Sequence, residues 1–318
     1  MFGFAWSRIE LQTWEGRNEV TMDSMTGYVM PMEPPITGWD IHCHTAFSDG
    51  TETPAVLAEQ SKAVGLKGVS ISDHDTTAGW PQAEAAARKV GLPLLRGAEI
   101  TATDDGVSVH MLGFQYDPTD QCIVDLFART RQARLRRTQH MVELMSKDLP
   151  ISWESVLAQV KEGGNTTIGR PHIADALVAA GVYQNRSEAF ADAVSASSKY
   201  YIPTPSPTAR EVVAAVKGAD GVILIAHAGD LSRNRRLLSD EQIEALIAEG
   251  LDGLEVWHRG NLPEQRERLL GICARYHLLV TGGSDWHGKG KPNLLGENLT
   301  DEATVAEIVR RGALPLYR

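Results

Sequence analysis

The sequence is poor in cysteine, in long apolar runs and in positive charge, and each shortage excludes a class of protein. Its three cysteines, Cys43, Cys122 and Cys273, are scattered and form no CxxC pair, so we expect a reducing compartment, the cytoplasm, and no disulfide framework. No run of about 18 apolar residues occurs, so no membrane span is expected. Because the formal net charge is -10, binding of duplex DNA through a broad basic surface is not expected either.

The N-terminal segment, residues 1–36, lacks the pattern of a secretory signal, because no basic start is followed by a continuous apolar core. We interpret it as an extension packed on the surface. The whole chain has 318 residues, of which 42% are hydrophobic and 23% charged. That length and composition are ordinary for a globular protein with one large domain, or one domain with an insertion.

Short apolar runs alternate with helical patterns from residue 38 to residue 116. The segments "GWDIHCH", "LKGVSISDHD", "LPLLRGAEI" and "GVSVHMLGF" are typical of strands. Between the first two, "TPAVLAEQSKAVG" predicts a helix with Thr53 as N-cap, Pro54 at the first helical position and Gly65 as its stop. A second helix, "AGWPQAEAAARKVG", is predicted to end at Gly91. This alternation predicts a parallel sheet covered by helices.

The alternation stops after Tyr116 and resumes about ninety residues later. Residues 118–205 are predicted to be helical almost throughout, and the Pro-rich "YIPTPSPTAREVV" closes them. Strand-like runs then return in "GVILIAHAG", "LDGLEVWHRG" and "HLLVTGGSDWHG". We therefore predict an α/β barrel built from residues 37–117 and 206–318. The intervening residues, 118–205, would form a helical insertion domain that caps the substrate.

Nearly every predicted strand ends in a histidine or a carboxylate. His42 and His44 stand two positions apart, so they point to one face of their strand and form a compact pair of metal ligands. The other strand ends and their loops supply Asp49, His74, Glu99, His110, His227, Asp285 and His287. In a barrel these ends converge on one rim, where so many uncompensated polar groups would be costly to bury. The pattern therefore predicts a metal site.

The order of these motifs, HxH, Asp, "SDHD", "GAE", His, "AH" and "DWH", resembles the PHP (polymerase and histidinol phosphatase) family of metal-dependent phosphoesterases. The resemblance covers Trp39 to about Leu299. It implies a distorted (β/α)7 TIM-like barrel that holds two or three divalent ions, with Mn favoured and Fe or Zn as alternatives. The implied ligands are His42, His44, Asp49, His74, Glu99, His110, His227, Asp285 and His287.

Two features resemble the branch of this family that acts on small nucleotides. Asp49 stands where many relatives have a histidine, and "GRPHIADAL" in the insertion is similar to that branch. The resemblance favours removal of the 3'-phosphate from a nucleoside 3',5'-bisphosphate, which would give AMP from adenosine 3',5'-bisphosphate. Related 5'-to-3' trimming of short RNA is a second activity of that branch, so the expected partners are small phosphorylated nucleotides and short RNA.

Divalent ions can activate a water molecule and neutralise phosphoryl oxygens during in-line displacement, which suits a phosphoesterase. We interpret Asp49, His227 and Asp285 as candidate catalytic residues, with His227 or Asp285 as the proton donor to the leaving alkoxide. Three alternatives stay open. A cyclic phosphodiesterase or another phosphomonoesterase would use the same chemistry. A C–N amidohydrolase would use a bridging lysine, but no lysine ends a strand in this sequence. A non-catalytic metal-binding module would not need nine candidate ligands.

Several basic residues are candidates for binding the substrate. Arg170 and His172 begin a predicted helix, where backbone N–H groups favour anions, and we expect them to bind a phosphate that is not cleaved. Lys199, Arg233 and Arg235 are further candidates. The arginines of "RTRQARLRR" fit a solvated helix face from which one member could turn to the site. Lys291 remains open between a loop role and a ligand role.

Overall fold

The computed structural model describes residues 28–162, 166–233 and 236–318. Within them, seven strands form one sheet in sequence order: β1 (Trp39–Asp40), β2 (Gly68–Ile71), β3 (Leu94–Asp104), β4 (Val107–Phe114), β5 (Val222–Ile225), β6 (Gly253–Trp257) and β7 (Leu279–Gly282). The segment after β7 returns to β1, where Cys43 and Trp286 form a parallel bridge and His44 N donates to Trp286 O at 2.8 Å. The sheet is thus a nearly closed barrel, as predicted.

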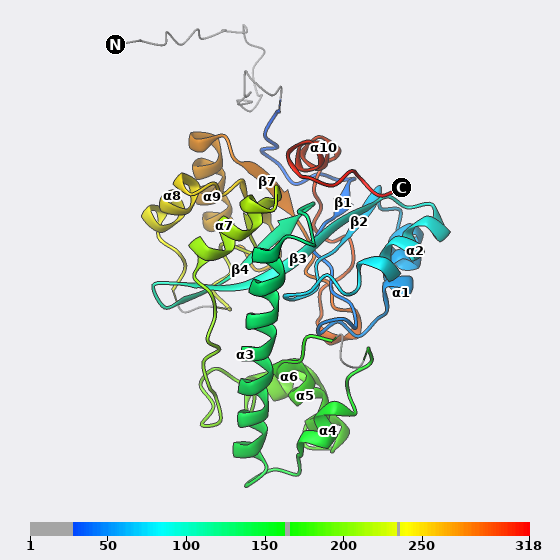
Figure 1. The fold of residues 1–318 in the computed structure, drawn as a ribbon, viewed down its shortest axis with the longest axis vertical. Helices are drawn as coiled ribbons and strands as arrows, with labels where there is room; N and C mark the ends of the chain where they lie inside the picture. Colours follow the sequence, from blue (N-terminus) through cyan, green and yellow to red (C-terminus); the bar gives the residue numbers. More distant parts are fainter. Residues whose placement is uncertain (1–27, 163–165, 234–235) are drawn as a thin grey trace, which may run out of the picture.

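Helices cover the outside of the barrel (Figure 1). They are α1 (Pro54–Ala63), α2 (Trp80–Val90), α7 (Ala209–Gly218), α8 (Asp240–Ala248), α9 (Pro263–Tyr276) and α10 (Glu302–Arg311). The predicted start of α1 is confirmed, because the Thr53 side chain accepts a hydrogen bond from Val56 N and Pro54 is the first helical residue. The predicted stop of α2 is confirmed at Gly91, which caps the helix in the left-handed conformation.

The prediction of a parallel sheet is wrong at one strand. β4 runs antiparallel to both β3 and β5. The turn between β3 and β4 is Asp105–Gly106, with φ of 43° and 75°, as a tight two-residue hairpin requires. Such a turn leaves no chain for a crossover helix, so the strand must return antiparallel. His110 consequently lies within β4, opposite Thr101, and not at a strand end.

The helical insertion contains α3 (Gln121–Met145), α4 (Trp153–Leu157), α5 (Arg170–Ala179) and α6 (Arg186–Ala191), and is less helical than predicted. α3 enters from the barrel, where Ile123 and Leu126 join the main hydrophobic core. Its other end, with Met141 and Met145, belongs to a second apolar cluster made with α4, α5 and α6. Because a helix rises about 1.5 Å per residue, α3 is roughly 37 Å long and carries this cluster away from the barrel (Figure 1). We propose that residues 118–205 form an insertion domain with its own core.

The predicted N-terminal extension lies partly outside the described residues. Its described part does more than cover the surface, because Tyr28 and Met30 are buried in the barrel core. Tyr28 Oη lies 3.1 Å from Thr304 Oγ1 and accepts from Val280 N at 3.2 Å. Along the described ranges, every helix is too short or too polar to cross a lipid bilayer.

Candidate metal centre

The barrel brings the nine candidate ligands together at one rim. Eight of them fall into three groups whose ligand atoms lie within 4.8 Å of one another: His44, Asp49, His74 and His287; His42, His44, Glu99 and Asp285; and His74, Glu99 and His110. His44, His74 and Glu99 each belong to two groups, so the groups are contiguous. The ninth, His227, lies 2.9 Å from Glu99 Oε1 through its Nε2.

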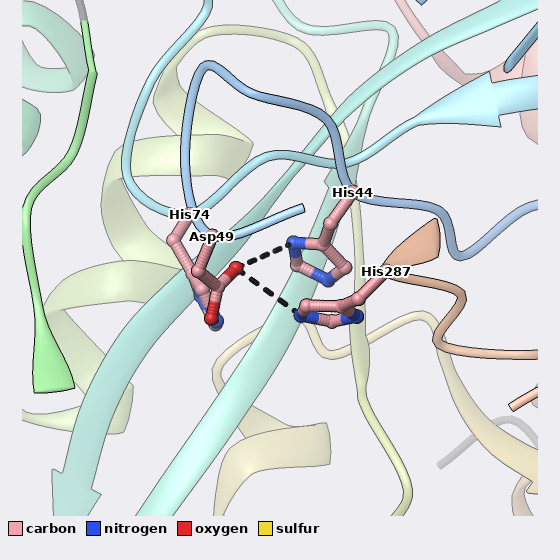
Figure 2. Close-up of side chains that lie close together, drawn as sticks. All are labelled: His44, Asp49, His74 and His287. Atoms are coloured by element: carbon pink, nitrogen blue, oxygen red, sulfur yellow. Dashed lines mark ion pairs between the residues drawn. The ribbon is translucent and has the colours of Figure 1, made fainter. Parts of the chain in front are cut away.

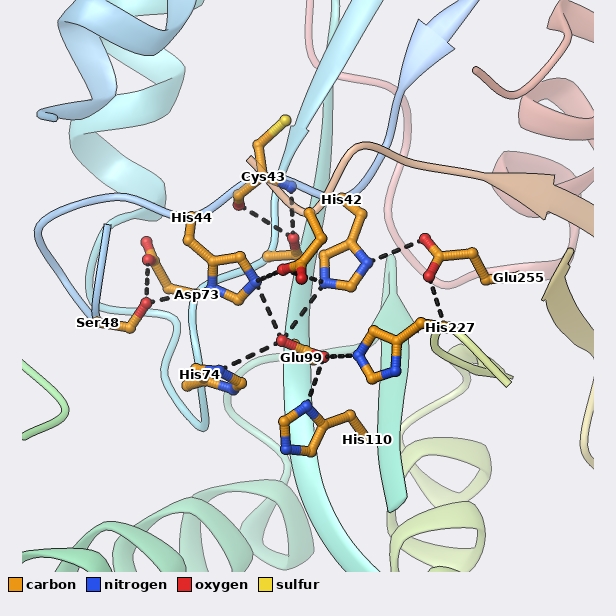
Figure 3. A network of polar contacts seen from close by, with 12 residues as sticks. His42, Cys43, His44, Ser48, Asp73, His74, Glu99, His110, His227 and Glu255 are labelled. Atoms are coloured by element: carbon orange, nitrogen blue, oxygen red, sulfur yellow. Dashed lines mark hydrogen bonds and ion pairs between the residues drawn. The ribbon is translucent and has the colours of Figure 1, made fainter. Parts of the chain in front are cut away.

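Glu99 is the centre of the arrangement (Figure 3). Its Oε1 accepts from His110 Nδ1 at 2.8 Å and from His227 Nε2 at 2.9 Å. Its Oε2 lies 3.0 Å from His44 Nε2 and 3.4 Å from both His42 Nε2 and His74 Nε2. One carboxylate therefore touches five imidazoles, of which His110 lies in β4 and the other four lie in the segments after β1, β2 and β5.

Asp49 organises the group at the other side of His44 (Figure 2). Its Oδ1 lies 3.1 Å from His287 Nε2 and 3.6 Å from His44 Nδ1, and its Oδ2 lies 3.8 Å from His74 Nε2. The rings of His44 and His287 are stacked with centroids 4.0 Å apart. Asp73, a residue without a predicted role, accepts from Thr45 N at 2.7 Å and so holds the start of the loop that carries Asp49.

Several ligand atoms in this cluster are buried without a hydrogen-bond partner among the described residues. They are His42 Nε2, His44 Nε2, Glu99 Oε2, Asp285 Oδ1 and His287 Nε2. The first four face one another at 3.0 to 3.5 Å. Unpaired lone pairs of buried imidazoles and carboxylates are costly unless a cation accepts them. This donor set therefore fits divalent cations.

The carboxylates and the histidines of the cluster shift one another's pKa values. Burial alone would lower the pKa of His44, but Asp285 and Glu99 raise that pKa to about 9. Burial would raise the pKa of Glu99, but His110, His74 and His42 hold it well below its usual range. Without an ion, the carboxylates are thus ionised and His44 keeps a proton between them. An ion bound there would displace that proton, so metal affinity must fall as the pH falls.

Glu255, which the sequence interpretation missed, holds two of the candidate ligands in place. Its Oε1 accepts from His42 Nδ1 at 2.9 Å, and its Oε2 accepts from His227 N at 2.6 Å. The contact with Nδ1 leaves His42 Nε2 facing the cluster, which is how outer carboxylates orient metal-binding histidines. Gly283 permits this approach, because a Cβ there would overlap His42. The sequence feature that could have identified Glu255 is its position as the one carboxylate inside the apolar run "GLEVW".

Replacing Glu255 by Gln should lower Mn²⁺ affinity about 10- to 100-fold, the usual cost of losing such an outer partner. Glutamine keeps the shape but removes the charge that fixes the His42 tautomer. Isothermal titration with Mn²⁺ measures the effect, with Glu211→Gln on an exposed helix end as the control. Unchanged Mn²⁺ affinity in Glu255→Gln would show that His42 is oriented without it.

Two cations converge on Asp285. Arg233, a predicted substrate-binding residue, contacts Asp285 Oδ2. Lys291 Nζ donates to the same oxygen at 2.8 Å. Burial would raise the pKa of Asp285, but Lys291 and Arg233 hold it well below its usual range. The other oxygen, Oδ1, is left facing His42 and His44. Arg235, the neighbouring candidate, lies outside the described residues.

Arg170 and His172 lie at the start of α5, as predicted. Arg170 Nη1 donates to Val194 O at 3.2 Å, and its guanidinium lies over the rings of Phe190 and Tyr201 at 5.4 and 5.5 Å. His172 is buried, and its Nδ1 accepts from the backbone N–H of Gly169 at 3.2 Å. Both side chains are therefore held by the insertion domain.

The arginines of α3 are less solvated than predicted, because three of them turn inward. Arg131 Nη1 donates to Thr76 Oγ1 at 3.1 Å. Arg134 Nη1 donates to Asp75 Oδ2 at 3.1 Å and to Thr101 Oγ1 at 2.7 Å, on the barrel rim beside His74. Arg137 is buried, donates to Ile202 O at 2.5 Å and stacks on Tyr201. Burial, together with the charge of Arg170, lowers the pKa of Arg137 to about 10.

Lys199 does not reach the cluster. Its Nζ lies 2.7 Å from Asp148 Oδ2, and its side chain is 71% exposed. Asp148 lies shortly after Met145, the end of α3 that is farthest from the barrel (Figure 1). The prediction that placed Lys199 near the mouth did not account for the length of α3.

The sequence resembles known proteins over most of its length. Residues 40–201 match the PHP domain. A 5'-3' exoribonuclease of Haemophilus influenzae is 28% identical, with 82% of this chain and 94% of that protein covered. A 3',5'-nucleoside bisphosphate phosphatase of Chromobacterium violaceum is 26% identical (79% and 88% covered). A phosphoribosyl 1,2-cyclic phosphate 1,2-diphosphodiesterase of Eggerthella lenta is 27% identical (79% and 94%).

Two solved structures share the architecture. A protein of Bifidobacterium adolescentis ATCC 15703, assigned as a metal-dependent phosphoesterase, is 72% identical and superposes with a TM-score of 0.88, covering 88% of this chain and 98% of that one. An amidohydrolase from Chromobacterium violaceum, with bound sulfate and no metal, is 25% identical with a TM-score of 0.74, covering 86% and 96%. The barrel and its rim are thus an arrangement seen in other chains.

Proposed function

The chain belongs to the PHP family of metal-dependent phosphoesterases, and on this premise we propose that it removes the 3'-phosphate from nucleoside 3',5'-bisphosphates. Such a substrate carries two phosphates, so it needs a place for the phosphate that is cleaved and a second place for the one that stays. The observation that carries the proposal is the presence of arginines around the ligand cluster, where Arg233 contacts Asp285. Arg134 contacts the rim next to His74, and Arg170 lies at the start of α5.

Arginine suits the retained phosphate because its planar fork matches phosphate oxygens. The charges of Arg134 and Arg233 both act on Arg170, so these guanidinium groups share one electropositive region. Burial lowers the pKa of Arg170, because its guanidinium has lost contact with water. An anion bound among these three side chains would offset that loss.

The ligand cluster would receive the phosphate that is cleaved. We propose that His42, His44, Asp49, His74, Glu99, His110, Asp285 and His287 hold up to three divalent ions, one for each of the three groups. Ions bound there supply activation of water and neutralise charge on the phosphoryl oxygens. Arg233 and Lys291 keep Asp285 ionised and oriented. Asp285 is ionised, and burial together with the charge of Arg233 holds the pKa of His227 well below its usual range, so neither side chain has a spare proton. We propose that water protonates the leaving alkoxide.

The test is phosphate release with Mn²⁺ from adenosine 3',5'-bisphosphate, with AMP and p-nitrophenyl phosphate as controls. We expect rapid release from the bisphosphate that stops at AMP, because only the bisphosphate can occupy the cluster and the arginines at once. Equal release from all three compounds would retain the phosphoesterase chemistry and reject this substrate.

Trimming of short RNA from the 5' end is the second candidate, favoured by the similarity to the Haemophilus influenzae exoribonuclease. The same assay with a 5'-phosphorylated trinucleotide separates the two proposals. Faster release of mononucleotide from the trinucleotide than of phosphate from the bisphosphate would favour RNA. The opposite order favours the bisphosphate.

A further inference from the structure

The insertion domain makes hydrogen bonds to the loop that carries Asp49. Four contacts run from the insertion to backbone carbonyls of that loop: Thr166 Oγ1 to Ala46 O at 3.0 Å, Thr167 N to Phe47 O at 2.9 Å, Arg186 Nη1 to Asp49 O at 2.7 Å, and Lys161 Nζ to Thr51 O. Each of these carbonyls belongs to the short segment between His44 and Glu52. The backbone around Asp49 is therefore positioned in part from outside the barrel.

Arg186 is the contact that joins the most segments. Its Nε and Nη2 donate to the two carboxylate oxygens of Asp175 on α5, both at 2.5 Å, while its Nη1 donates to Asp49 O. Its side chain is only 11% exposed. A Cβ on Gly290, three residues after His287, would overlap Arg186 Nη1, so the turn after His287 also packs against this guanidinium.

α5 connects this guanidinium to the arginine region. The helix carries Arg170 and His172 at its start and Asp175 one turn later. The electrostatic field at His172 includes Asp49, Arg186 and Asp175, so the helix start and the Asp49 loop lie close together. α5 is one continuous helix, so its start and Asp175 are joined by backbone hydrogen bonds.

We propose that Arg186 couples anion binding at the start of α5 to metal binding by the group of His44, Asp49, His74 and His287. An anion that fixes α5 fixes Asp175, and through Arg186 it fixes the backbone of Asp49 and the turn after His287. Coupling between two binding sites is reciprocal, so the metal also tightens anion binding by the same factor. Arg186 is thus a positioning residue. The inference rests on the proposed function, because it requires a phosphate at α5.

The experiment measures Mn²⁺ binding with and without AMP, by the electron paramagnetic resonance signal of free Mn²⁺. AMP is the probe because it carries a 5'-phosphate and is the proposed product. In the wild-type protein AMP should tighten the binding of at least one Mn²⁺ by about fivefold or more, the lower end of typical coupling. In Arg186→Lys that ratio should fall towards one, because an ammonium group cannot bridge the Asp175 carboxylate and Asp49 O as a planar fork does.

Arg275→Lys is the matched control, since Arg275 is 63% exposed and pairs with Glu244 on the barrel surface. Asp175→Asn is a second variant that cuts the same link from the other side and should lower the ratio equally. AMP binding is measured separately by equilibrium dialysis. A wild-type ratio in both Arg186→Lys and Asp175→Asn overturns the coupling, as does a wild-type protein that binds AMP without any change in Mn²⁺ affinity. A wild-type protein that binds Mn²⁺ but not AMP overturns the proposed substrate, and this inference with it.

Discussion

Replacing Glu99 by Gln will lower metal-dependent phosphate release by at least about a thousandfold, equivalent to roughly 4 kcal/mol of transition-state stabilisation. Glu99 contacts His42, His44, His74, His110 and His227 with two carboxylate oxygens. Glutamine has the same shape, but one carboxylate oxygen is replaced by an amide NH2 group, which donates hydrogen bonds and offers no lone pair to a metal. It therefore removes one ligand atom and one negative charge from the centre of two of the three groups.

The same substitution should abolish the rise in Tm that Mn²⁺ gives to the wild-type protein. A ligand stabilises the folded state by an amount set by its concentration relative to Kd, so a weakened site yields a smaller shift. Differential scanning fluorimetry with and without Mn²⁺ measures this independently of the substrate. Glu244→Gln, at an exposed ion pair with Arg275, is the matched control and should keep both activity and shift. A Glu99→Gln protein with the wild-type shift in Tm would place the bound ions elsewhere.

The convergence of the candidate ligands was predictable because it depends on local rules. Residues two apart in an extended segment share a face, which brings together His42 and His44 just beyond β1, and strand ends of a barrel meet at one rim. His110 reaches the same rim for another reason. It lies within the antiparallel strand β4, directly across from Thr101 of β3, two residues beyond Glu99. The pattern of apolar residues does not encode strand direction, so the hairpin at Asp105 had to be seen in the structure.

The contacts between the two parts of the chain were not predictable in the same way. Arg137 and Arg134 belong to an arginine-rich helix that looks solvated in sequence, yet Tyr201 and Asp75 bury them. Those partners lie more than fifty residues away along the chain, and only packing decides which face of α3 meets them. Glu255 is hidden for a similar reason, because an isolated carboxylate in an apolar strand has no local signature of the histidine that it orients.

Replacing Arg170 by Ala should lower kcat/KM for adenosine 3',5'-bisphosphate by about 10- to 100-fold, with the loss mainly in KM. Charged hydrogen bonds are worth about 1.5–3 kcal/mol, which corresponds to that range. Adenosine 3'-monophosphate has the same bond to cleave but no 5'-phosphate, so its kcat/KM should stay within about twofold. The comparison isolates the retained phosphate, because the ligand cluster is the same in both reactions.

Two further variants separate charge from packing. Arg170 also stacks on Phe190 and Tyr201, so truncation removes apolar contact as well as the guanidinium. Arg170→Lys keeps a cation and should retain part of the bisphosphate rate, whereas loss of packing alone would impair both substrates equally. Arg129→Ala on α3, where the side chain is 65% exposed, is the control and should affect neither. An equal loss on both substrates in Arg170→Ala would make the arginine a structural part of the insertion domain, and the handle for the second phosphate would then have to be sought at Arg134 or Arg233.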